Sequence, residues 1–164
     1  MGKELHFEYD DEETFRNCIK KFHNYMITEG YELLEKNTEV PVFSTNDILF
    51  VKNNYEALAK DFYKERPVSF EKGVELVVEN INIIIDSDWD EIKSELMGIA
   101  GALTFILLKE KENSKLTEST TTDSFFVEYD SEKHMRIDPV RLVYNSYIKK
   151  DPDKWIIKKL INNN

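Results

Sequence analysis

The pattern of hydrophobic and polar residues predicts a chain that is organised around one central helix. Residues 96–108 read LMGIAGALTFILL and contain no charged side chain. A helix that is apolar on every side belongs in a protein interior or in a membrane. Thirteen residues rise about 20 Å, which is short of the ~30 Å hydrocarbon layer, so the interior is the better interpretation. The sequence therefore predicts a buried central helix at about 88–110.

The start of this helix and its small residues carry further information. Ser87 and Asp90 match a capping-box pattern, which predicts the helix start at Ser87. Glycine costs about 1 kcal/mol against alanine inside a helix. We therefore expect Gly98 and Gly101 to lie where neighbouring helices approach closely.

Helical spacing of apolar residues predicts two helices before the central one, at 44–65 and 69–85, each opened by a serine cap. Because the second is followed almost at once by the central helix, these two are expected to pack as an antiparallel hairpin. Strands are the alternatives at 48–52 and at 83–85, where apolar and β-branched residues gather.

Further helices are predicted near both ends of the chain. Asp138-Pro139 and Asp151-Pro152 each place a capping residue before a proline, which is favoured in the first helical position. Short helices are therefore expected at about 139–149 and 152–162. An amphipathic helix is also expected over 11–30.

Alternation of apolar and polar residues predicts a small antiparallel sheet. Residues 5–9 and 125–129 show this period of two most clearly, and 31–34 and 40–43 are candidates for short strands. Before the strand at 125–129, residues 109–124 contain one large apolar residue in sixteen, which is typical of a flexible polar loop.

The predicted fold class is mostly helical α+β, with four or five helices around the central helix and a small antiparallel sheet. The length of 164 residues is that of a single domain with one sizeable core.

The charge of the chain restricts its partners. The net charge is −10, whereas residues 138–164 alone carry three acids and six bases. An acidic surface repels nucleic-acid phosphate, so direct nucleic-acid binding is not expected, and a basic protein, or a protein with a basic site, is the expected partner.

Cysteine usage and the first residues bear on localisation. The single Cys18 excludes an intramolecular disulfide, and MGKELHFEYD lacks the apolar stretch of a signal peptide. Both features favour the cytoplasm, and no membrane span is expected.

Metal and cofactor binding are not predicted. Asp86, Asp88 and Asp90 have the spacing of a calcium loop, but Glu91 and Met97 stand where that loop needs Gly and Glu. The three histidines lack metal-ligand spacing, and no glycine-rich phosphate loop is present.

One catalytic pattern is present on the predicted N-terminal helix. Arg16 and His23 lie seven residues apart and share a helical face. With Asn17 after the arginine, they resemble the motif of HEPN-type ribonucleases. The resemblance implies metal-independent RNA cleavage, with His23 as acid–base and Arg16 supporting the phosphate. The alternative is a solvated helix edge.

The leading hypothesis is a non-enzymatic binding protein that occludes a protein partner. Inhibitors, immunity proteins and antitoxin-like proteins of bacterial or phage origin fit the size and the acidity, and a structural subunit of a larger assembly is a further alternative. Acidic side chains would steer a basic target. The candidate contact residues are Asp10, Asp11, Glu12, Glu13, Asp86, Asp88, Asp90, Glu91, Glu128, Asp130 and Glu132.

Overall fold

A computed structural model describes residues 16–17, 20–21, 41–110, 113–120, 123–129 and 135–161. Contacts group the chain into two units, residues 1–40 and 41–164, and each is described by itself. The described residues of the first unit are helical and exposed: Arg16, Asn17, Lys20 and Lys21. The strands expected at 5–9 and 31–34 lie outside the described residues, and the single domain stays a prediction.

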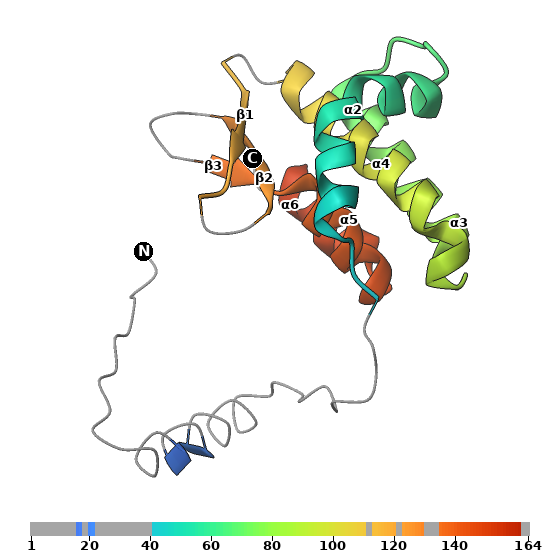
Figure 1. The fold of residues 1–164 in the computed structure, drawn as a ribbon. Helices are drawn as coiled ribbons and strands as arrows, with labels where there is room; N and C mark the ends of the chain where they lie inside the picture. The colour runs from blue at the N-terminus through green and yellow to red at the C-terminus, as the bar shows by residue number, and fades with distance from the viewer. Residues whose placement is uncertain are drawn as a thin grey trace. The chain divides into compact units, whose positions relative to one another are not determined.

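The second unit is built around the predicted central helix, α4 (Trp89–Glu110). Figure 1 shows this helix among its neighbours, and its most extensive contacts are with four of them. These are α2 (Thr45–Tyr63), α3 (Phe70–Ile84), α5 (Pro139–Ile148) and β2 (Phe125–Tyr129). Its buried residues are Ile92, Leu96, Ile99, Ala100, Gly101, Ala102, Leu103, Thr104, Ile106 and Leu107. The mostly helical α+β fold with a buried central helix is confirmed.

The serine caps set the starts of α2 and α3 as predicted. At α2, the Asp47 N–H donates to Ser44 Oγ (3.2 Å) and the Ser44 N–H donates to Asp47 Oδ2 (2.7 Å), which is a complete capping box. At α3, Ser69 accepts from the Lys72 N–H at 3.3 Å. Both helices run unbroken, so the alternative strands at 48–52 and 83–85 are wrong.

The start of α4 lies later than the expected cap at Ser87. The Asp88 carbonyl accepts from the Ile92 N–H at 3.2 Å, so the helical hydrogen bonds begin at Asp88. The Ser87 carbonyl instead accepts from the hydroxyl of Tyr147 on α5 at 2.6 Å. This contact holds the α3–α4 turn against the C-terminal part of the chain.

The two aspartate-proline pairs also start helical segments. Asp138 caps α5 by accepting from the Arg141 N–H at 2.8 Å. Asp151 accepts from the Lys154 N–H at 3.1 Å. The segment after Pro152 is a π-helix, η1 (Asp153–Ile157), which continues into the short α6 (Lys158–Leu160).

The sheet has three antiparallel strands in the order β1-β2-β3, with β1 at Lys115–Glu118 and β3 at Met135–Ile137. Strand β2 lies at the predicted 125–129. The structure differs from the loop predicted at 109–124, because α4 extends to Glu110 and β1 lies within it. The described part of the strand expected at 40–43, residues 41–43, is not a strand.

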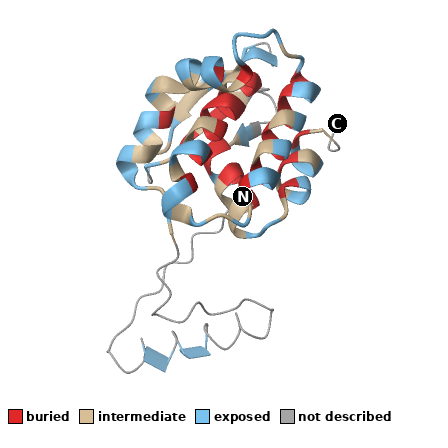
Figure 2. Cartoon of the chain, turned by 90° about the vertical axis from the view of Figure 1, so that its right-hand side faces the viewer, coloured by how far each residue is buried: buried red, intermediate tan, exposed pale blue. Residues whose placement is uncertain are grey.

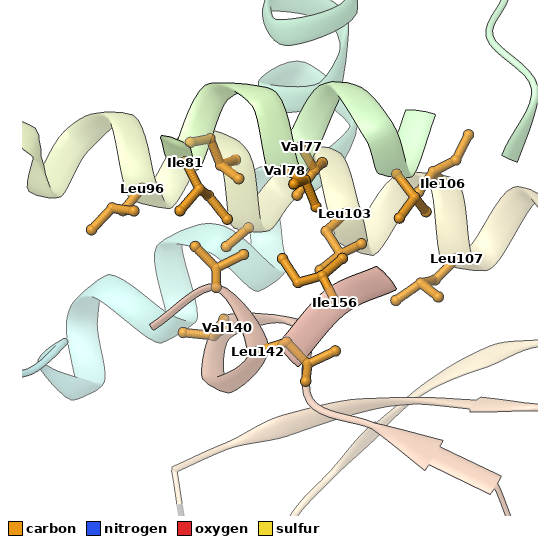
Figure 3. Packing of buried hydrophobic residues seen from close by; sticks show 14 of the residues in the cluster. Val77, Val78, Ile81, Leu96, Leu103, Ile106, Leu107, Val140, Leu142 and Ile156 are labelled. Atoms are coloured by element: carbon orange, nitrogen blue, oxygen red, sulfur yellow. The ribbon is translucent and has the colours of Figure 1, made fainter. Parts of the chain in front are cut away.

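The core of the second unit lies between α4 and the elements around it. Figure 2 shows the buried positions along the helices, with exposed positions on their outer sides. Figure 3 shows how side chains of α3 and α4 meet those of α5 and η1. The labelled residues are Val77, Val78, Ile81, Leu96, Leu103, Ile106, Leu107, Val140, Leu142 and Ile156, all buried.

The two glycines of α4 differ in their surroundings. A Cβ added at Gly101 would lie 2.6 Å from the Cβ of Leu58 on α2, whereas one added at Gly98 would meet nothing within 4 Å. Close helix approach therefore explains Gly101, as predicted, but not Gly98. Leu58 cannot yield easily at Gly101, because its Cβ is fixed to the backbone.

We predict opposite effects of alanine at these positions. Gly101→Ala is expected to destabilise the protein by about 1–3 kcal/mol, because it overpacks the α2–α4 contact. Gly98→Ala is expected to stabilise it by about 0.5–1 kcal/mol through helix propensity. Urea unfolding of both variants measures the two changes, and a destabilised Gly98→Ala or a neutral Gly101→Ala would contradict this packing.

Candidate functional site

The turn between α3 and α4 gathers four of the predicted acidic contact residues. Asp86, Asp88, Asp90 and Glu91 are all exposed. The Lys150 ammonium donates to Asp86, and this hydrogen bond raises the pKa of Lys150. The others lie at the N-terminal end of α4, where the helix dipole favours negative charge. We call this group of four residues the acidic turn.

An exposed isoleucine lies beside the acidic turn. Ile83, in the last turn of α3, is 77% exposed, whereas its neighbours Ile81 and Ile84 are buried in the core. Its neighbours on the outer side of the helix include Glu79, four residues earlier, which is also exposed. Single exposed apolar side chains are common on protein surfaces. Ile83 differs in that exposed carboxylates lie on either side of it in the sequence, at Glu79 and Asp86.

Of the remaining predicted acids, the structure describes Glu128, which is not part of this surface. The Glu128 side chain on β2 is 13% exposed, accepts from Thr117 Oγ1 at 2.9 Å and lies 3.7 Å from the Arg136 guanidinium. Contacts within the sheet therefore account for this carboxylate. Figure 1 shows the sheet beyond the C-terminal end of α4, away from the acidic turn. The other predicted acids, Asp10, Asp11, Glu12, Glu13, Asp130 and Glu132, lie outside the described residues.

The ribonuclease pattern is described only in part. Arg16 and Asn17 are helical and exposed, and His23 lies outside the described residues. The pairing of Arg16 with His23 therefore stays a prediction.

The described residues contain neither a cluster of metal ligands nor a membrane-spanning helix. Among them, no group of three His, Cys, Asp or Glu side chains converges as metal ligands would. None of the described helices is both long and apolar enough to cross a bilayer.

A second surface feature, which the sequence pattern did not predict as a site, is a groove between the sheet and the C-terminal helices. It has a volume of about 490 Å³ and contains cationic side chains from three elements: Arg136 of β3, Arg141 of α5 and Lys159 of α6. The Lys159 Nζ lies 4.7 Å from the ring centroid of Trp155. We call this the cationic groove. Its lining is completed by Phe126, Ile137, Asp138, Leu142, Asn145, Trp155 and Leu160.

Asp138 lies between the cationic groove and a neighbouring, largely apolar pocket of about 290 Å³. Burial raises the pKa of its carboxyl, and the N–H and charge of Arg141 oppose the shift without cancelling it. The apolar pocket is lined by Val42, Phe43, Ile48, Ser124, Asp138, Val140, Arg141 and Tyr144.

The signals for these features were present in the sequence but were incomplete. The excess of bases in residues 138–164 indicated local positive charge, but Arg136 comes from β3, which the pattern did not predict. The run of three isoleucines at 83–85 was ambiguous, and only the helical assignment turns Ile83 outward.

Comparisons with known proteins give no relative: the chain matches no protein-family model, no curated protein and no solved structure.

The position of Asp138 predicts how stability changes with pH. Its raised pKa means that the folded state holds the proton more tightly than the unfolded state, so the stability due to this group is present at low pH and lost as pH rises through the folded-state pKa. Asp138→Asn keeps a good helix cap without the charge. We expect the variant to be more stable than the wild type at pH 7.

This difference should shrink as pH falls through the raised pKa of the folded state and should be gone below the usual Asp pKa of 3.8. Urea unfolding at a series of pH values measures it, and circular dichroism at each pH checks that α5 stays helical. A stability difference that is constant between acid and neutral pH would contradict the prediction.

Proposed function

We propose that this protein is a small non-enzymatic binding protein that occludes a basic site of a protein partner through the acidic turn and Ile83. The observation that carries the proposal is Ile83, which is 77% exposed beside exposed carboxylates. Charge and apolar surface are thus combined at one end of the α3–α4 hairpin.

The two kinds of side chain have separate physical roles. Exposed carboxylates steer a basic partner and select against acidic ones, which affects association rate and specificity more than affinity. Burial of Ile83 contributes about 1.5–3 kcal/mol if its side chain is fully covered. That is the size of a typical interface hot spot, so Ile83 is the anchor and the acids are the rim.

The same features support the class of protein that we propose. Inhibitors, immunity proteins and antitoxin-like proteins of bacterial or phage origin act by covering a partner's functional site. The net charge of −10 supports a basic partner and disfavours direct nucleic-acid binding. The single cysteine supports a cytoplasmic location.

The experiment is affinity capture of the tagged full chain from its native cells, with nuclease treatment, followed by mass spectrometry. We expect one stoichiometric protein with a basic surface. Ile83→Ser is expected to weaken the complex about tenfold or more, because the apolar contribution is lost. Asp88→Lys is expected to slow association and to reduce its dependence on salt.

Glu71→Lys is the matched control, because Glu71 is an exposed acid at the opposite end of α3. The control variant should bind like the wild type. Ile83→Ser should keep its stability within about 0.5 kcal/mol because the site is exposed. Asp88→Lys and Glu71→Lys each reverse a charge at a helix N-terminus and should each lose about 0.3–1 kcal/mol, which makes them a matched pair. A captured partner that binds all three variants equally well, or a partner with an acidic surface, would refute the proposal.

A further inference from the structure

The cationic groove has a chemistry opposite to that of the acidic turn. Three cationic side chains and one carboxylate line it, in a chain whose net charge is −10. The cations come from a strand, a helix and the final helical segment, so the fold, and not a run of sequence, brings them together.

The cations of the groove are not equally available to a ligand. Arg136 lies 3.7 Å from Glu128, so part of its charge is already balanced. Arg141 and Lys159 are exposed, and neither lies within 4 Å of a carboxylate of a described residue, although the charge of Arg141 also acts on the Asp138 carboxyl. The contact of Lys159 with Trp155 holds the ammonium over the ring and leaves its N–H groups able to donate. Arg141 and Lys159 are thus the main anion-binding candidates.

The charge and size of the groove select a class of ligand. A phosphate monoester carries about −1.5 to −2 at neutral pH, so it matches two or three cations better than a single carboxylate does. Arginine donates to phosphate with two parallel N–H groups. The volume of about 490 Å³ lies within the range of small-molecule pockets, about 300–1,000 Å³. Inorganic phosphate alone would leave most of it empty.

We propose that the cationic groove binds a small organic phosphate, in which Arg141 and Lys159 hold the phosphate group while Trp155 and Phe126 contact an apolar or aromatic body. This site shares no residue with the acidic turn, and the inference does not rest on the proposed function.

The acidic surface outside the groove limits the size of the ligand. At physiological salt the Debye length is about 8 Å, so a compact anion in the groove interacts mainly with the nearby cations. A nucleic acid or a long acidic peptide extends further and meets the acidic surface, which repels it. The groove is therefore selective for a small anion over a polyanion.

Adenosine monophosphate is a suitable probe, with adenosine and inorganic phosphate as comparators. The readout is NMR of the two tryptophan indole N–H groups in the full chain, because Trp155 lines the groove and Trp89 packs in an aromatic cluster with Phe43 and Tyr144. We expect adenosine monophosphate to shift the Trp155 signal in a saturable way and to leave Trp89 unchanged. Each comparator should bind at least about tenfold more weakly, because it lacks one half of the contacts.

Substitutions test the two anion-binding residues. Arg141→Gln and Lys159→Gln are each expected to weaken binding about tenfold or more through the loss of a charge-assisted hydrogen bond. Lys154→Gln is the matched control, because Lys154 is exposed on η1 and does not line the groove. The control should bind as the wild type does, and circular dichroism verifies that all three variants are folded.

Four outcomes would overturn the proposal. The first is that the Trp155 shift does not saturate at about 10 mM probe, and the second is that Lys154→Gln and Arg141→Gln lose equal amounts of binding affinity. The third is that adenosine binds as tightly as its monophosphate. The fourth is that an RNA oligonucleotide binds more tightly than the mononucleotide.

Discussion

The burial of α4 is the constraint on which the second unit depends. Its middle third has no charged side chain, and its buried residues extend over most of its length, so it needs neighbours on several sides. Helices α2, α3 and α5 and strand β2 provide them. The close contact of Gly101 with Leu58 sets the separation of α2 and α4. Because so much of the surface of α4 is buried in the core, the surface of this unit is formed by the elements around α4 and by the ends of α4.

On the described surface, acidic and basic side chains gather at separate places. Carboxylates gather where α3 turns into α4, and cations gather where the sheet meets α5 and α6. Charges of opposite sign on separate surfaces allow two ligands of different kinds to bind without competing. Asp138, which caps α5 and lines both cavities beside it, connects the groove to the helical core.

The sequence predicted those parts of the fold that depend on interactions between residues close together in the chain. Ser44 and Ser69 marked two helix starts because a serine cap acts within three residues, and alternation marked β2 because one of its faces is buried. Strands β1 and β3 were missed, since each is short and exists through pairing with β2. The start of α4 lies one residue later than expected, because Ser87 and Asp88 are both good capping residues and the sequence pattern does not choose between them. The cationic groove depends on such long-range pairing at Arg136, so its residue set could not be predicted from spacing.

The π-helix η1 makes the position of Lys159 sensitive to chain length. Its wide turn closes with the Lys158 N–H bonded to the Asp153 carbonyl, five residues earlier, and so holds one residue more than an α-turn. Each residue of a helix turns the chain by about 100°. Loss of one residue from η1 would let this wide turn close as an ordinary α-turn, so that Leu160 stays in the core and Lys159 over the Trp155 ring, whereas one further residue inserted into η1 would rotate α6 and move both. A single-codon insertion in this segment would therefore alter the groove and the core together, whereas most substitutions at its exposed positions would alter neither.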